Sequence, residues 1–174
     1  MARIAVDMDE VIADFNAKFI TSLNSRFDKQ LTLADLYNTK IEYLLPELIQ
    51  DIKAMIRESD FFADLPVMPH SQSVLAQMVN QHEIFITTAA MEFPLSFNAK
   101  FNWLQQHFPF IDPMNIVFCG YKTIINADYL IDDNVHHFSK FRGEGILFTS
   151  PHNVAIEGFR RVNNWQEVAE IFLG

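Results

Sequence analysis

The chain has 174 residues, of which 49% are hydrophobic, and a formal net charge of −9. This length allows one domain, or a core with a small insertion, and the apolar content excludes an intrinsically disordered chain. An acidic chain without a run of Lys or Arg is not typical of proteins that bind polymeric nucleic acid. No apolar run approaches the ~20 residues of a membrane helix, so no membrane partner is expected either. The single cysteine, Cys119, favours a reducing, cytoplasmic location.

Five short apolar runs predict β-strands. They are continuously apolar rather than alternating, which is typical of parallel strands that are buried on both faces. Amphipathic helical patterns separate some of them, and alternating strands and helices indicate right-handed crossovers. We therefore predict an α/β fold with a doubly wound, mainly parallel, five-stranded sheet. The predicted strands are residues 3–6, 84–87, 116–118, 129–131 and 146–148.

Residues 7–70, between the first strand and the helix predicted at 71–81, are too many for a structureless loop. Two amphipathic helices fit inside this segment, one around Phe15 and Phe19 and one beginning at Pro46. We predict a core domain of residues 1–13 and 71–174 with a helical cap, 14–70, inserted after the first strand. Ligands bind outside the carboxyl ends of strands in open α/β sheets, so the cap should cover the site.

Acidic side chains follow two of the predicted strands. Asp7, Asp9 and Glu10 come directly after the first strand, and Asp132 and Asp133 end the fourth. Each group alone could be a solvated turn or a helix cap. Together they would place two carboxylate pairs at one sheet edge, and such hard oxygen ligands suit Mg²⁺. No His or Cys spacing favours zinc.

Two further features lie at the same predicted edge. The second strand ends in Thr88-Ala89, where a hydroxyl and exposed backbone N–H groups can hold phosphate oxygens. Lys122 precedes the fourth strand and would balance the charge of carboxylates and phosphate. Taken alone, Thr88 could be an ordinary cap and Lys122 a solvated loop residue.

The order strand-DxD, strand-Thr, Lys, strand-DD matches the four motifs of the haloacid dehalogenase superfamily. More narrowly, the chain resembles the 5'(3')-deoxyribonucleotidases. The resemblance implies a phosphomonoesterase that uses Mg²⁺ and an aspartyl-phosphate intermediate to dephosphorylate (deoxy)ribonucleoside monophosphates. The resembling stretches are residues 7–15, 61–69, 85–89, 100–103, 122–133 and 148–153.

The resemblance also implies roles for residues of the predicted edge. Asp7 would be the nucleophile and Asp9 the general acid/base. Asp7, the backbone carbonyl of Asp9, and Asp133 would bind Mg²⁺, with Asp132 in support. Thr88, Ala89 and Lys122 would hold the phosphoryl group.

Three residues are candidates for substrate contacts: Phe15, expected to face the nucleoside, Tyr37 and Lys100. Glu10 stands where many family members have Gly, and we expect it not to touch the chemistry. The middle of the cap, residues 31–56, matches the family only loosely. Two alternatives stay open, a phosphatase of the same mechanism acting on a sugar phosphate or other phosphometabolite, and a catalytically silent binding protein. Assembly into a homodimer is also left open.

Overall fold

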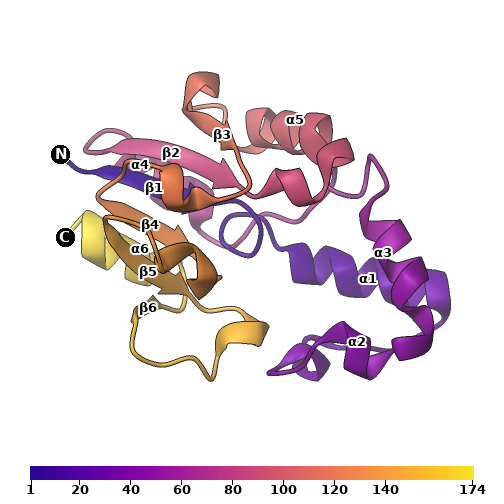
Figure 1. The fold of residues 1–174 in the computed structure, drawn as a ribbon. Coiled ribbons are helices and arrows are strands. Elements are labelled where there is room, and N and C mark those ends of the chain that lie inside the picture. Colours follow the sequence, from indigo (N-terminus) through magenta and orange to yellow (C-terminus); the bar gives the residue numbers. More distant parts are fainter.

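The computed structural model describes all residues, 1–174. Parallel strands form one sheet in the order β3-β2-β1-β4-β5-β6, so β1 lies in the middle and the chain crosses to its other side between β3 and β4 (Figure 1). This arrangement confirms the predicted parallel α/β fold. The strands are β1 (Arg3–Asp7), β2 (Glu83–Thr88), β3 (Ile116–Phe118), β4 (Tyr129–Asp132), β5 (Glu144–Phe148) and β6 (Arg160–Val162).

The sheet has six strands, so the prediction of five was wrong. The additional strand, β6, pairs in parallel with β5 at one edge of the sheet. Its sequence is Arg160-Arg161-Val162, and only Val162 is buried. A strand with two arginines has no apolar run, and its existence depends on pairing with a neighbour distant in sequence.

The two faces of the sheet are covered differently. Helices α4 (Ser71–Met78), α5 (Phe97–His107) and α6 (Trp165–Phe172) contribute to one large hydrophobic cluster with strand residues such as Ile4 and Ile86. The opposite face carries Ala5 and Leu130, which pack against residues such as Phe138 of the short 3₁₀ turn η7 (Val135–Phe138). Short turns rather than long helices therefore cover this part of the sheet.

The segment between β1 and α4 is helical and lies beyond the carboxyl end of β1 (Figure 1). Pro46 begins a 3₁₀ turn, so the helix predicted there begins at Ile49. Cap and core residues belong to one hydrophobic cluster, and the domain boundaries at residues 13/14 and 70/71 stay a prediction. The elements are α1 (Phe15–Phe27), η1 (Leu33–Leu36), α2 (Ile41–Leu44), η2 (Pro46–Leu48) and α3 (Ile49–Ile56).

Two buried tryptophans connect both ends of this segment to the core. Trp165 of α6 donates its indole N–H to the carbonyl of Val11 at 2.7 Å, and Trp103 of α5 donates to Leu65 at 2.8 Å. Both indoles are about 1% exposed, so these bonds satisfy donors that would be costly to bury alone. The bond of Trp165 holds the turn after β1, and the bond of Trp103 holds the loop before α4. None of the helices is long and apolar enough to cross a membrane.

Candidate active site

The carboxyl ends of β1 and β4 bring three acids together. Asp7 is the last residue of β1, Asp132 is the last residue of β4, and Asp133 follows it. Their carboxylate oxygens lie within 4.8 Å of one another, and all three side chains are buried. The two acidic groups that the sequence placed at one sheet edge therefore meet.

Lys122 provides the positive charge inside this cluster. Its buried Nζ lies 2.5 Å from Oδ1 of Asp7 and 2.6 Å from Oδ2 of Asp132. The other oxygen of Asp132 accepts the backbone N–H of Asn134 at 2.9 Å. Asp132 is thus engaged on both oxygens, whereas Asp133 has a carboxylate without a hydrogen bond from the protein.

One ammonium does not balance three buried carboxylates. Burial raises the pKa of Asp7 to about 7, although Lys122 opposes this, and Asp132 and Asp9 add to it. Burial, followed by repulsion from Asp7 and Asp132, raises the pKa of Asp133 well above its ordinary value. Burial alone would lower the pKa of Lys122, but its two ion pairs outweigh burial and raise it. The cluster is therefore short of positive charge.

A divalent cation fits this site. The available donors are carboxylate and carbonyl oxygens, the ligands preferred by hard cations. Oδ1 of Asp9, close to the cluster in sequence, is buried without a hydrogen-bond partner. A bound cation would supply the charge that three buried carboxylates and one ammonium lack.

Asp9 is held by a second buried lysine. Lys100 of α5 donates from Nζ to Oδ2 of Asp9 and, at 3.0 Å, to Oγ1 of Thr88. Its ammonium also lies 4.4 Å from the ring centroid of Phe62, a cation–π contact. The sequence suggested Lys100 only as a substrate contact, and the structure places it against Asp9. Ala89 follows Thr88 at the start of the next 3₁₀ turn.

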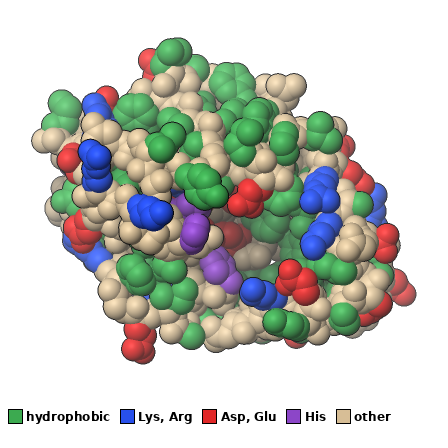
Figure 2. All heavy atoms as spheres, viewed as in Figure 1, with side chains coloured by type: hydrophobic (Ala, Val, Ile, Leu, Met, Phe, Trp, Pro, Cys, Tyr) green, Lys and Arg blue, Asp and Glu red, His purple; other side chains and the backbone are tan.

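Two neighbouring cavities open beside these residues. The first, of about 270 Å³, is lined by acids of the site and by aromatic side chains of cap and core. The second, of about 200 Å³, is mostly apolar and lies against α1 and η1. Figure 2 shows acidic and histidine side chains around a hollow in this face of the molecule. The first cavity is lined by Asp9, Glu10, Phe15, Asn16, Phe62, Phe93, Asp133 and His152.

Phe15 and Tyr37 are both candidates for substrate contacts, but they differ in their position relative to the two cavities. Phe15 begins α1, stacks on Phe19 with ring centroids 5.8 Å apart, and lines both cavities. Tyr37 ends η1, is 48% exposed and lines neither cavity, although Leu36 and Thr39 beside it line the second. The structure therefore brings Phe15, but not Tyr37, to the site.

The whole chain, residues 1–174, matches the model of a family described as "5' nucleotidase, deoxy (Pyrimidine), cytosolic type C protein". The chain belongs to this family. It is 44% identical over 173 residues to a Staphylococcus epidermidis protein provisionally named 5'(3')-deoxyribonucleotidase, covering 98% of this chain and 95% of that protein. It is 36% identical over 174 residues to the 5'(3')-deoxyribonucleotidase of Bacillus subtilis, covering 95% of each.

Solved structures agree on the fold. A haloacid dehalogenase-like family protein from Streptococcus pneumoniae has a TM-score of 0.66 at 11% identity, covering 99% of this chain and 98% of that one. The HAD-hydrolase YfnB from Bacillus subtilis has a TM-score of 0.63 at 14% identity, covering 99% of each chain. This structural likeness confirms the predicted haloacid dehalogenase-like fold. The family match and the relatives confirm the 5'-nucleotidase family and the class of phosphoric monoester hydrolase.

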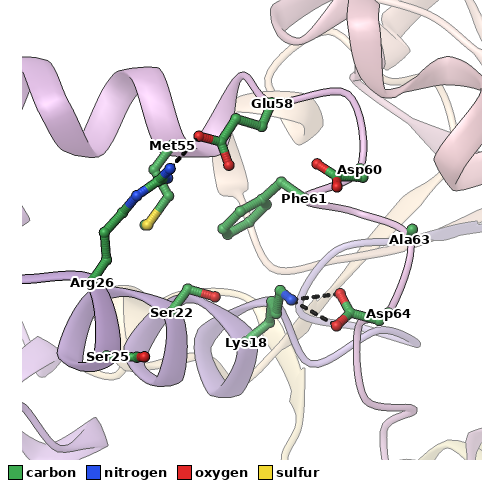
Figure 3. Close-up of a pocket in the computed structure, with 10 residues that line it drawn as sticks. All are labelled: Lys18, Ser22, Ser25, Arg26, Met55, Glu58, Asp60, Phe61, Ala63 and Asp64. Carbon is green, nitrogen blue, oxygen red and sulfur yellow. Dashed lines mark hydrogen bonds and ion pairs between the residues drawn. The ribbon is translucent and has the colours of Figure 1, made fainter.

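A larger cavity in this nucleotidase-family chain, of about 400 Å³, lies on the cap between α1 and residues 55–64. Two ion pairs of 2.6 Å flank it, Lys18 with Asp64 and Arg26 with Glu58 (Figure 3). Its lining includes no predicted site residue, and its cations are already paired with acids. We do not assign the nucleotidase site to this cavity.

Three residues of the candidate site were not proposed as functional from the sequence. Glu10, Asn16 and His152 all line the first cavity. Glu10 was expected not to touch the chemistry, and Asn16 lies one residue beyond the resembling stretch 7–15. His152 could have been identified from the sequence, because it lies in the stretch 148–153 that resembles the family.

Proposed function

We propose that this chain is a Mg²⁺-dependent 5'(3')-nucleotidase that works through an aspartyl-phosphate and prefers deoxyribonucleoside monophosphates. The observation that carries the proposal is the buried carboxylate of Asp7 beside Lys122, with Asp9 two residues on. A carboxylate nucleophile next to a fixed cation suits attack on a phosphate dianion, which would otherwise be repelled.

The proposed reaction has two steps. A carboxylate oxygen of Asp7 attacks phosphorus and the bond to the ester oxygen breaks, while Asp9, which must be protonated for this step, gives its proton to the leaving alkoxide. Asp9 then takes a proton from water, whose oxygen attacks the same phosphorus and releases Asp7 and inorganic phosphate. Splitting a very slow hydrolysis into two easier displacements is the benefit of covalent catalysis.

The residues around Asp7 and Asp9 have supporting roles in this proposal. Lys122, the hydroxyl of Thr88 and the backbone of Ala89 hold the transferring phosphoryl group. Lys100 contacts both Asp9 and Thr88, so it orients the acid/base and adds charge next to the phosphate. Fixed positive charge that faces the reacting oxygens is a large source of rate enhancement in such sites.

Asp7, the backbone carbonyl of Asp9, and Asp133 would hold Mg²⁺. Asp132 supports the site indirectly, because its oxygens are engaged by Lys122 and Asn134. When bound, the ion offsets the repulsion between the Asp7 carboxylate and the phosphate dianion. The choice of Mg²⁺ over other divalent ions rests on the all-oxygen donor set.

The pair of cavities supports a nucleotide as substrate. Phosphate would lie at the acidic end of the first cavity, and the nucleoside would extend past Phe15 toward the apolar second cavity. An apolar wall favours a sugar that lacks the 2'-hydroxyl, because burying an unpaired hydroxyl costs roughly 1–3 kcal/mol. A sugar phosphate is the second candidate, since the phosphoryl end would be recognised in the same way.

Phosphate release across paired deoxy- and ribonucleoside monophosphates and sugar phosphates tests the proposal. We expect kcat/KM to be about ten- to a hundredfold higher for the deoxy member of each pair. Excess chelator should abolish turnover reversibly, and Asp7→Asn should abolish it with Mg²⁺ present. If a sugar phosphate had a higher kcat/KM than every nucleotide, the substrate would be a sugar phosphate. Full turnover in excess chelator would contradict the proposed dependence on Mg²⁺.

A base contact by Tyr37, a cytoplasmic location and a homodimer also stay predictions. The location agrees with the word "cytosolic" in the family description. Sedimentation of the purified chain would establish its oligomeric state.

A further inference from the structure

The turn after β1 contains an acidic residue, Glu10, that is buried and has a positive φ angle. Glu10 is 7% exposed, although glutamate is rarely buried without partners. Its φ of 62° lies in the left-handed region, which is unfavourable for a residue with a side chain. A glutamate buried in this conformation requires specific contacts to hold it there.

The carboxyl group of Glu10 accepts three hydrogen bonds, two from nearby Asn16 and one from Ser150, which is distant in sequence. Oε1 accepts the backbone N–H of Asn16 at 2.6 Å, and Oε2 accepts the side-chain amide of Asn16. Oε2 also accepts the hydroxyl of Ser150, from the loop after β5, at 3.0 Å. Glu10 therefore joins the first turn of the cap helix α1 to a loop of the core. We call Glu10, Asn16 and Ser150 the Glu10 clasp.

The clasp continues to His152. Oγ of Ser150 lies 3.2 Å from Nδ1 of His152, and Nε2 of His152 lies 3.1 Å from the carbonyl oxygen of Asp133. Because a carbonyl oxygen only accepts, Nε2 is the donor to Asp133, and this bond places the ring between the clasp and the proposed metal ligand.

The residues fixed in this way lie where the two cavities meet. Asn16 and His152, together with Phe15, are the residues that line both the first and the second cavity. A substrate with its phosphorus at Asp7 and its base in the apolar cavity must pass between them. The sugar of a nucleotide would therefore lie at this junction.

We propose that Glu10 is a positioning residue for the nucleoside part of the substrate. This inference rests on the proposed nucleotidase function. Through Asn16 and Ser150, Glu10 fixes the cap wall and the His152 wall of the junction at one separation. It acts on substrate binding and leaves the transfer of the phosphoryl group to Asp7 and Asp9.

Steady-state kinetics of Glu10→Ala on two substrates tests this role. We expect KM for a deoxyribonucleoside monophosphate to rise about tenfold, with a smaller change in kcat, because a binding contact is lost. KM for p-nitrophenyl phosphate, whose single ring is shorter than a nucleoside, should change much less. Glu10→Gln keeps an acceptor for the N–H of Asn16 and should restore part of the affinity for the nucleotide.

Two further variants separate the clasp from general destabilisation. Ser150→Ala should reproduce the selective rise in KM, and adding it to Glu10→Ala should raise KM little further, since both break one connection. Asp14→Ala is the matched control, because Asp14 caps the same helix by accepting the N–H of Ala17 at 2.9 Å but makes no bond to Ser150. It should leave KM for the nucleotide unchanged.

An unchanged KM for the nucleotide in Glu10→Ala, or equal rises for both substrates, would overturn the inference. If Glu10→Ala does not fold, Glu10→Gln and Ser150→Ala answer the question through the same two substrates. If the proposed function is wrong, the wild-type chain will not hydrolyse nucleotides. If only the positioning role of Glu10 is wrong, the wild-type chain will hydrolyse nucleotides and the variants will lack the selective rise in KM.

Discussion

Lys100 of α5 donates a hydrogen bond to Asp9, in the turn after β1, and another at 3.0 Å to the hydroxyl of Thr88 at the end of β2. Its side chain is 1% exposed, so the ammonium is taken out of water to make these contacts. Burying a lysine is unfavourable unless its charge is paired, and Asp9 provides the pairing. The position of the proposed acid/base thus depends on a residue from a distant helix.

Replacing Lys100 by Met should lower kcat roughly 100-fold, because Asp9 loses its ion pair and the phosphate loses a nearby cation. Lys100→Arg should not restore full activity, since a planar guanidinium does not fit the place of a compact ammonium. Initial rates over a range of nucleotide concentrations separate kcat from KM. Lys18→Met, which breaks the pair with Asp64 outside the site, is the control. A kcat that stays within twofold of wild type would contradict the role of Lys100.

The two partners in the Asp7–Lys122 ion pair should differ in their effect on stability. In Asp7→Asn, Lys122 keeps its bond to Asp132 and one repelling charge is removed, so stability should stay near that of wild type or rise. In Lys122→Met, the buried acids lose their cation, and unfolding free energy should fall by about 3–5 kcal/mol. Urea unfolding of both variants in chelator measures the difference. Equal losses in the two variants would show that repulsion among the acids is unimportant.

The place of the acids could be predicted from sequence because it follows from topology alone. Parallel strands end at one edge, so acids that follow β1 and β4 must lie close together once these strands pair. Thr88 was found for the same reason, because it is the last residue of β2. Lys122 was found from its place between β3 and β4, where it begins the 3₁₀ turn η6 (Lys122–Ile124). The resemblance to the family supplied their proposed roles, which the arrangement of strands cannot provide.

Other features depend on tertiary contacts that no local pattern reports. The strand β6 exists through its pairing with β5, although its own sequence is basic. The contact of Lys100 with Asp9 depends on how α5 is held, in part by the bond of Trp103 to Leu65. Three acids in four positions likewise do not reveal which of them turns inward, and Glu10 does so because Asn16 and Ser150 meet it.

Glu10 should make stability depend on pH. Burial, despite the hydrogen bonds from Asn16 and Ser150, raises its pKa from 4.5 to about 7 in the folded state. Between these two pKa values the folded chain binds more protons than the unfolded chain. The resulting contribution of Glu10 to the free energy of unfolding is fully present below pH 4.5 and is lost as pH rises through about 7.

Comparison of wild type with Glu10→Gln isolates this contribution. The stability of wild type relative to the variant should fall on the order of 3 kcal/mol between pH 4.5 and pH 7.5. Urea unfolding at four pH values across this range, at constant ionic strength, gives the difference directly. A difference that is independent of pH, or that grows as pH rises, would show that Glu10 is ionised in the folded chain at all these values.

Magnesium should stabilise the fold through Asp133. This carboxylate is buried beside Asp7 and Asp132. Nδ1 of His152 lies 3.7 Å from it, but burial lowers the pKa of this histidine and so disfavours its charged form. A bound cation would remove the repulsion, and an ion at 100 times its Kd adds about 2.7 kcal/mol of stability. For a chain of this size the melting temperature should rise by about 5–10 °C.

In Asp133→Asn the metal-free protein should melt no lower than wild type, because a buried like charge is gone, but the shift with Mg²⁺ should largely disappear. Glu144→Gln, which alters an exposed pair with Arg160, should keep the full shift. If Asp133→Asn showed the same shift as wild type, the ion would be binding elsewhere and Asp133 would not be its ligand.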